Sequence, residues 1–473
     1  MVFSSYLFIC IFLPITLGVY YLLSKLDNDI YQRLFLITAS LVFYGYQNTY
    51  YLLLIIFSVI INYMLSYFMT VNHIAAKPIL ILGIVFNILL LGYFKYFNFI
   101  LDNINFVFKT SYFVEKIMLP LGISFFTFQQ LSFLISIYKK EQKLGRFIDY
   151  SLFVVFFPQL VAGPIVLYNE MIPQFAKKSI RYYNPKNFSR GIYIFSMGLF
   201  KKAVIADTLA LFVNNGFGME NVGLIPAWIT VFSYTFQLYF DFSGYCDMAI
   251  GIGRMFNVKL PINFDSPYKS ASISEFWRRW HITLGRALGT YIYHPLGGNR
   301  KGLIRTCTNL MITFFISGLW HGAEWTFVIW GGVHGFVVVI EKVFAGKLEK
   351  IPYILRVSVT FILVNLFWVL FRAESFLEAI KLYRGMINFR YIGLFDLKDI
   401  VFDSIINFPT IVDMIYIIGI LIVLFIIIFR TKDSYTMLEE YRPTYKSVLI
   451  AIMLFCVSLI FISKESVFIY FNF

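Results

Sequence analysis

One long stretch of the sequence, residues 34–76, contains no Asp, Glu, Lys or Arg. Other apolar stretches recur along the chain, and charged residues make up only 14% of it, against about 25% in soluble domains. An apolar run of about 20 residues is long enough to cross a bilayer as a helix. Because backbone polar groups must be paired inside a bilayer, the pattern predicts an all-α, polytopic integral membrane protein.

The apolar segments predict roughly ten to thirteen passes, re-entrant ones included. The first lacks the basic start and the cleavage site of a signal peptide, so we expect it to be a retained helix. The tyrosine-rich residues 44–50 predict a break between two helices. Glycines in residues 306–340 allow either a kink or a pair of shorter helices. The expected passes are residues 1–24, 34–76 (as two helices), 78–94, 120–138, 191–212, 225–252, 306–340, 357–371, 414–429 and 447–463.

Domain organisation is expected to be simple, with one membrane domain over residues 1–473. Within it we distinguish N-terminal helices (1–118), a core (119–372) and a C-terminal loop with helices (373–473). The longest polar insertion is residues 372–413. No internal repeat is visible, which disfavours a transporter built from inverted halves.

The formal charge of +14 has two possible meanings, nucleic-acid binding or membrane topology. The basic residues lie between apolar spans, so we expect lipid headgroups rather than nucleic acid as their partner. Two basic clusters, in residues 139–146 and 177–202, are expected to face the cytoplasm. The apolar residues 150–169 between them are then expected to be re-entrant. The alternative is an ordinary helix kinked at Pro158.

The four cysteines are scattered, mostly within apolar runs, and show no CxxC or Cys/His spacing. The sequence therefore predicts neither a disulfide framework nor a metal site.

Residues 264–335 contain four of the five histidines and five of the seven tryptophans. His321 lies in the apolar residues 306–340, whose only charged residue is Glu324. A histidine at membrane depth is costly unless it has a partner or a task, and imidazole moves protons near neutral pH. His321 and His281 are therefore candidate catalytic residues, with a packed structural histidine as the alternative.

Seven strings in this chain, in this order, carry a family resemblance. They are LPLGISFFTFQ (119–129), FPQLVAGPI (157–165), GLFKKAVIAD (198–207), YTFQLYFDFSGYCDMAIGIG (234–253), WRRWHITL (277–284), PLGGNR (295–300) and GLWHGA (318–323). With these strings the chain resembles the membrane-bound O-acyltransferase family, in the bacterial branch that includes alginate and peptidoglycan O-acetyltransferases and the teichoic-acid D-alanylation membrane subunit. Residues 263–265 read Asn-Phe-Asp, where the family is expected to have Asn-Phe-Asn.

The resemblance implies a bundle of many helices around a central tunnel. It also implies that His321 is the signature catalytic histidine and that His281 lies in the same tunnel. Acyl transfer from a thioester to a hydroxyl needs a base for the O–H proton and a donor for the oxyanion, roles that these histidines suit. The chain has no Gly-x-Ser-x-Gly string, so a serine acyl-enzyme has no support.

Five further residues are candidates for lining the tunnel or contacting substrate. Glu324 is three residues from His321 and can orient it across one helical turn, or is only its neighbour. The two aspartates 241 and 247 lie in an apolar helix and mark a polar interior. The remaining histidines, 73, 294 and 334, are expected to be structural or solvated. The candidates are Trp320, Glu324, Asp241, Arg278 and Arg279.

The predicted function is O-acetyl transfer in the cytoplasmic (inner) membrane. We expect no bound cofactor; the donor would be a cytoplasmic thioester, either acetyl-CoA or an acyl-carrier protein. The acetyl group would pass to an extracytoplasmic acetyltransferase partner and a polysaccharide such as alginate-like exopolysaccharide, peptidoglycan or cellulose. The alternatives are D-alanyl transfer to teichoic acid and, from another class, a transporter or flippase.

Overall fold

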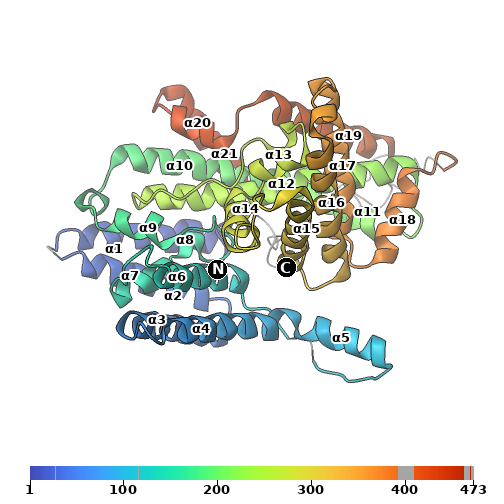
Figure 1. Ribbon diagram of the computed structural model, residues 1–473. Coiled ribbons are helices and arrows are strands. Elements are labelled where there is room, and N and C mark those ends of the chain that lie inside the picture. The colour runs from blue at the N-terminus through green and yellow to red at the C-terminus, as the bar shows by residue number, and fades with distance from the viewer. Residues whose placement is uncertain (27, 116, 392–409, 463–468, 470–473) are drawn as a thin grey trace. The chain divides into compact units, whose positions relative to one another are not determined.

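The computed structural model is built almost entirely of helices (Figure 1). It describes the whole chain except residues 27, 116, 392–409, 463–468 and 470–473. Among the described residues the single β-type contact is an antiparallel bridge between Phe264 and Trp280. The prediction of an all-α protein is therefore confirmed.

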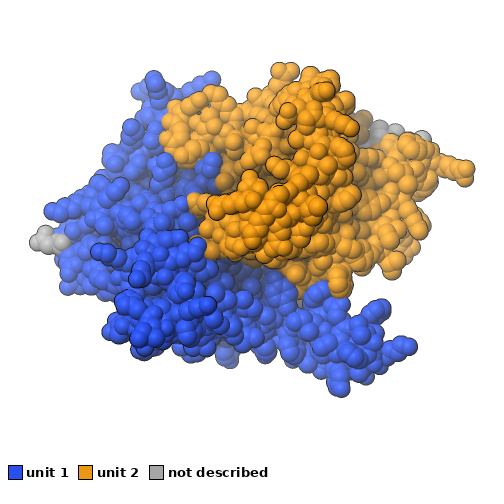
Figure 2. Space-filling view, viewed as in Figure 1, with its two compact units in different colours: residues 1–198, 245–262, 441–463 blue, residues 199–244, 263–440, 464–473 orange. Residues whose placement is uncertain are grey.

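The described chain groups into two compact units (Figure 2). Unit 1 consists of residues 1–198, 245–262 and 441–463. Unit 2 consists of residues 199–244, 263–440 and 464–473. Helix α12 (Leu224–Met255) contributes its first part to unit 2 and its last part to unit 1. The expectation of one membrane domain, divided near residues 118 and 372, stays a prediction.

Unit 1 holds the N-terminal helices and the last helix of the chain. A break between α2 and α3 falls inside residues 44–50, as expected, and the Asn48 side chain caps α3 by accepting from the Tyr50 N–H (2.8 Å). The helices, wholly or mostly in this unit, are α1 (Leu13–Leu23), α2 (Ile30–Gly45), α3 (Thr49–Val71), α4 (Ala76–Leu91), α5 (Phe97–Phe108), α6 (Ile123–Tyr138), α7 (Phe147–Val155), α8 (Phe157–Leu160), α9 (Tyr168–Phe175), α10 (Pro185–Phe200) and α21 (Tyr445–Phe461).

Buried amides join the helices of unit 1. Asn62 on α3 and Asn87 on α4 hydrogen-bond through their side chains, the Asn87 amide donating to Asn62 Oδ1 at 2.6 Å. Gln130 on α6 donates to the hydroxyl of Ser58 on α3 at 3.1 Å. Lipid cannot replace such bonds, so they help to fix which helices pack together in a membrane protein.

The segment expected to be re-entrant is broken into short helices. Helix α7 ends at Val155, the chain turns at Phe156, and α8 then begins with Pro158 in its first turn. Helix α7 is nine residues long, about 14 Å, which is too short to cross a core of about 30 Å. The segment is therefore not one continuous helix, and its re-entrant course stays a prediction. The cytoplasmic position of both flanks stays a prediction.

Unit 2 contains the histidine-rich part of the chain. The polar insertion 372–413 includes α18, and its residues 392–409 lie outside the described chain. The helices are the first part of α12 together with α11 (Asp207–Gly218), α13 (Ile273–Arg279), α14 (Ile282–Leu288), α15 (Gly302–His321), α16 (Trp325–Leu348), α17 (Tyr353–Arg372), α18 (Phe376–Met386), α19 (Thr410–Arg430) and α20 (Ser434–Glu440); the shorter η4 (Lys201–Ala206) and η5 (Pro267–Lys269) also lie here.

Five described helices are long and apolar enough to cross a membrane, and a bent pair, residues 415–430 with 434–440, makes a sixth at most. Four shorter apolar helices accompany them. This is fewer than the ten to thirteen passes expected, because several apolar segments form helices shorter than the ~20 residues that a straight span needs. The five long helices are residues 49–71, 76–108, 302–321, 325–348 and 353–372.

Helices α15 and α16 form a close antiparallel pair in place of one continuous helix over residues 306–340. A Cβ at Gly318 would lie 2.3 Å from the Phe327 carbonyl oxygen, and one at Gly331 would lie 2.3 Å from that of Phe314. Glycine at both positions therefore lets the two backbones touch, as in tightly packed membrane helices. Of the two alternatives left open by the sequence, the pair of shorter helices is confirmed.

Candidate active site

Two short helices, α13 and α14, are separated by Trp280 and His281 alone. Trp280 is extended, whereas His281 adopts a left-handed conformation with φ 48° and ψ 50°. Residues other than glycine rarely adopt positive φ, and such strained positions gather at functional sites. The surrounding structure must therefore hold His281 in place.

The residues that precede α13 supply this support. The Asp265 N–H donates to the Arg279 carbonyl oxygen (3.0 Å), and the Ile282 N–H donates to the Asn263 carbonyl oxygen (3.1 Å). The buried Asn263 side chain also accepts from the Thr283 hydroxyl at 2.6 Å. Asn263 therefore holds the chain just after His281, and Asp265 holds the chain just before it. Sequence reasoning gave Asn263 no role, because its side-chain partner, Thr283, lies 20 positions further along the chain.

His281 is fully buried among aromatic rings. Its ring centroid lies 4.8 Å from that of Phe242 on α12 and 5.8 Å from that of Trp320 on α15. Burial lowers the pKa of His281 to about 3, because the apolar surroundings disfavour the charged ring. His281 is therefore neutral at pH 7, with one nitrogen carrying a proton and the other a lone pair.

His321 is the last residue of α15 and is 1% exposed. The chain leaves the helix at Gly322, where a Cβ would lie 2.1 Å from the Phe327 ring. The His321 ring is surrounded by three aromatic residues: Trp320 and Trp330, each with its centroid at 5.0 Å, and Phe371 at 5.3 Å. Glycine and aromatic packing thus fix the position of this imidazole.

The two candidate histidines lie together although 40 positions separate them in the sequence. Their ring centroids are 6.3 Å apart, with an angle of 63° between the ring planes. Trp320 packs against both rings, with its ring centroid 5.8 Å from that of His281 and 5.0 Å from that of His321. Two buried imidazoles at this separation can act on adjacent atoms of one substrate, one as a base and the other as a hydrogen-bond donor.

Glu324 does not stand one helical turn from His321. Helix α15 ends at His321, and Glu324 is an exposed, extended residue just before α16. The expected orientation of His321 across a helical turn is therefore wrong, because glycine at 322 ends the helix.

Asp241 is buried in α12 within an ion-pair network of unit 2. Its carboxylate lies 2.7 Å from Lys202 Nζ, and Lys202 Nζ lies 2.8 Å from Asp207. The Ile469 N–H also donates to Asp241, at 2.9 Å. Asp241 thus marks a polar interior, as predicted, and the next residue, Phe242, contacts His281. Asp247 is buried in the part of α12 that belongs to unit 1.

The two arginines before Trp280 differ in their surroundings. Arg278 is exposed. Arg279 lies 2.9 Å from Glu275 and 3.7 Å from Asp265. Arg279 therefore braces the turn around His281, whereas Arg278 presents its charge to the surface.

The remaining histidines lie in different surroundings. His73 and His294 are exposed. His334 is fully buried on α16 and accepts a hydrogen bond from the Trp277 indole N–H at 3.1 Å. Trp330 contacts both His334 and His321 with centroids at 5.0 Å, so His334 belongs to the aromatic packing behind the site.

The described residues contain no group of three or more His, Cys, Asp or Glu side chains arranged to hold a metal ion. The chemical groups that the structure brings together are instead two imidazoles and indole and phenyl rings.

Comparison with known proteins places the chain in a family. A protein from Helicobacter pylori named peptidoglycan O-acetyltransferase is 42% identical over all of this chain and 98% of its own length. A probable alginate O-acetylase, AlgI, of Pseudomonas syringae pv. tomato is 40% identical over 82% of this chain and 76% of its own. A teichoic acid D-alanyltransferase of Bacillus subtilis is 25% identical over 54% of this chain and 69% of its own. The model of the MBOAT, membrane-bound O-acyltransferase family matches residues 39–372, which include both buried histidines, and this multi-pass membrane protein therefore belongs to that family of acyltransferases.

Proposed function

We propose that the protein is an O-acetyltransferase of the cytoplasmic (inner) membrane that serves an extracytoplasmic polysaccharide, and that His321 and His281 are its catalytic residues. The observation that carries the proposal is the buried pair of imidazole rings, with centroids 6.3 Å apart. The names of relatives that align over most of this chain favour acetyl transfer to peptidoglycan or an alginate-like polymer.

In this proposal an acceptor hydroxyl attacks the carbonyl carbon of a cytoplasmic acetyl thioester. His321 takes the hydroxyl proton as the new C–O bond forms, which is the work of a general base. Neutral His281 donates an N–H to the carbonyl oxygen as negative charge develops there. The C–S bond then breaks, and the thiolate receives the proton from His321. The products are an acetyl ester and a free thiol.

The donor is proposed to be acetyl-CoA or an acetylated carrier protein, which share the thioester that this reaction consumes. The acceptor is proposed to be the polysaccharide itself or a hydroxyl of an extracytoplasmic acetyltransferase partner. A tunnel through the membrane, lined in part by Trp320, would join donor and acceptor. D-alanyl transfer is less supported, because the relatives of that name align with about half of this chain.

The experiment that tests the proposal measures thioester consumption by purified protein in lipid nanodiscs. Acetyl-CoA and an acetylated carrier protein are offered in parallel, each together with a polysaccharide acceptor, and release of free thiol is followed with a chromogenic thiol reagent. His321→Ala should reduce the rate by about 10²–10⁴-fold, the usual loss with a general base. His73→Ala, at an exposed histidine, is the matched control and should retain the full rate.

A transporter or flippase would give a different result. It would release no thiol from either donor, or release it equally in the wild type and in His321→Ala. Either result would contradict the proposed acyl transfer, provided that all three proteins are monodisperse by size-exclusion chromatography.

A further inference from the structure

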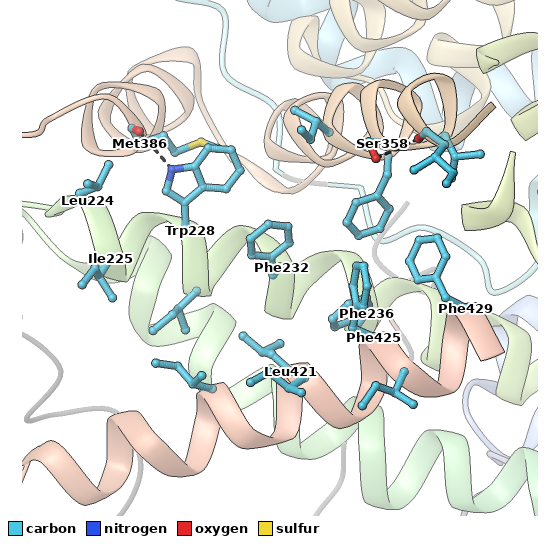
Figure 3. A pocket seen from close by; sticks show the side chains of 18 of the residues that line it. Leu224, Ile225, Trp228, Phe232, Phe236, Ser358, Met386, Leu421, Phe425 and Phe429 are labelled. Carbon is cyan, nitrogen blue, oxygen red and sulfur yellow. Dashed lines mark hydrogen bonds between the residues drawn. The ribbon is translucent and has the colours of Figure 1, made fainter. Parts of the chain in front are cut away.

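Unit 2 contains a large cavity, and neither His281 nor His321 is among the residues that line it. Figure 3 shows side chains of the lining. The volume of the cavity is about 1280 Å³, and helices α12, α17 and α19 line it together with the end of α18. Side chains such as Trp228, Phe232 and Phe425 point into it from facing helices. Helix α17 is long and apolar enough to cross the membrane, and residues 415–430 of α19 form part of the bent span. Hydrocarbon of the bilayer is therefore the solvent around this cavity.

The wall of the cavity offers almost nothing to a polar ligand. The indole N–H of Trp228 donates to the Met386 carbonyl oxygen at 3.1 Å. The Ser358 hydroxyl donates to the Ile354 carbonyl oxygen at 3.0 Å, within its own helix. These polar groups are used inside the protein, and the other side chains along the helices are apolar or aromatic. The occupant must therefore be mostly hydrocarbon.

One cation lies among the lining residues. Lys269 on η5 donates to the Thr431 carbonyl oxygen at 2.7 Å, just beyond the end of α19. An ammonium group has three donors, so two remain to bind an anion. The Tyr353 hydroxyl donates to the Lys269 carbonyl oxygen at 3.2 Å and holds this residue at the start of α17. The exposed Arg430 follows the lining residue Phe429 and adds positive charge at the same end of α19.

The length of the cavity matches one leaflet of a bilayer. On α12 the lining residues run from Leu224 to Phe236, which is about 18 Å of helix. Half of a hydrocarbon core of about 30 Å is about 15 Å. A chain anchored at Lys269 can therefore lie along α12 without leaving its leaflet.

The aromatic lining of the cavity argues against a transmembrane helix of a partner protein as the molecule that fills it. Helices pack closely in membranes through Gly, Ala, Ser and Thr. This wall instead presents large side chains from three different helices, among them Trp228 on α12, Phe361 on α17 and Phe429 on α19. Flexible acyl chains fill such an irregular surface, whereas a straight helix does not.

We propose that this cavity is a binding site for one anionic phospholipid of the surrounding bilayer, with its acyl chains between α12, α17 and α19 and its phosphate at Lys269. This site is separate from the acyl-transfer site and holds a resident lipid rather than a substrate. The lipid completes the packing of helices that a cavity of this size otherwise leaves apart.

Native mass spectrometry of the full-length protein tests the proposal. Protein purified in detergent is stripped of lipid and offered phosphatidylglycerol or phosphatidylcholine of the same chain length. The wild type should retain one phosphatidylglycerol in preference to phosphatidylcholine. Lys269→Met should weaken retention of phosphatidylglycerol about fivefold, the usual effect of one basic residue at a lipid headgroup. Lys342→Met, at an exposed lysine outside the cavity, should leave it unchanged.

Two neighbouring positions on α17 provide matched variants that test whether the acyl chains of the lipid occupy the cavity. Ser358 lines the cavity, and Val359 is exposed but does not line it. Ser358→Trp fills the cavity and should abolish lipid retention, whereas Val359→Trp should keep it. Ile422→Trp, from the facing helix α19, provides a second filling variant if Ser358→Trp is not monodisperse.

Three results would overturn the proposal. They are equal retention of the two lipids, equal effects of Ser358→Trp and Val359→Trp, and copurification of a protein or peptide that Ser358→Trp displaces while no lipid is bound.

Discussion

The imidazole rings of His281 and His321 lie with their centroids 6.3 Å apart, and Trp320 packs against both. His281 reaches this position through a left-handed backbone conformation, and His321 through the end of a helix at glycine. The left-handed backbone at His281 and the helix end at His321 each cost free energy, which contacts elsewhere in the fold must offset. Such costs are typical of sites where the position of a side chain matters more than local stability.

Replacing the two fully buried histidines His281 and His334 should separate catalysis from packing. We expect His281→Ala to lower thiol release by about 10²–10³-fold, because an oxyanion donor is lost. His334→Ala should leave the rate within about tenfold but destabilise the protein by about 1–3 kcal/mol, since the Trp277 N–H loses its acceptor.

The rates come from the thiol assay and the stabilities from thermal unfolding in detergent. If His334→Ala lost most of its rate but kept normal stability, His334 rather than His281 would be assigned the catalytic role.

The long stretches without charged residues were enough to predict helices. The break between α2 and α3 at Asn48 could also be predicted, because polar and tyrosine residues interrupt the apolar run there. The pairing of His281 with His321 came from the family resemblance, because the two residues are 40 positions apart and no periodicity of the sequence brings them together. The helix end at His321 was harder to place, because glycines at 318, 322 and 331 are equally compatible with a kink, a turn or close packing. Only the packing partner distinguishes them: a Cβ meets backbone at 318 and 331, and an aromatic ring at 322.

Contacts between distant parts of the chain could not be read from the sequence. Lys202 was assigned to a basic, cytoplasmic cluster, yet its side chain is buried against Asp241. The composition and spacing of a sequence show where each charged residue lies along the chain, but not which residue it pairs with in the fold. The amide of Asn263 was missed for the same reason, because its hydrogen bonds to Thr283 cross a loop and a helix.

Two glycines on α16 should respond oppositely to alanine. Gly331→Ala places a Cβ 2.3 Å from a backbone oxygen of α15, which must move, so we expect a loss of about 1–3 kcal/mol. Gly346→Ala, with nothing within 4 Å, should be neutral or stabilise by up to about 1 kcal/mol through helix propensity. Thermal unfolding of both variants measures this. Equal midpoints would mean that α15 and α16 are not packed through these glycines.

The positions of the two basic loops can be measured by cysteine labelling. Replacing all four native cysteines first removes the exposed thiols of Cys10 and Cys456. Lys143→Cys and Lys177→Cys then place single thiols at exposed positions in the two loops. A membrane-impermeant maleimide should label neither in intact cells and both after permeabilisation, because positive loops stay in the cytoplasm. Labelling of only one from outside would make residues 150–169 cross the membrane.

The buried pair of Lys202 and Asp241 should behave asymmetrically when each partner is removed. Lys202→Met leaves Asp241, 1% exposed, without its cation and should cost about 3–5 kcal/mol. Asp241→Asn should cost less, because Lys202 keeps Asp207 at 2.8 Å. The double variant should recover much of the loss, since no unpaired charge remains on Asp241. The exposed pair of Lys432 and Glu440 is the control, and Lys432→Met should cost at most about 1 kcal/mol.

Thermal unfolding of the four variants gives the stabilities, and the thiol assay on the same samples shows whether Asp241 also acts in catalysis. A structural network predicts that the double variant regains both stability and thiol release, because His281 and His321 remain in place. A stable Asp241→Asn variant that releases no thiol would instead assign Asp241 a direct part in the reaction. Additive losses in the double variant would show that the two charges do not interact, against the 2.7 Å between their atoms.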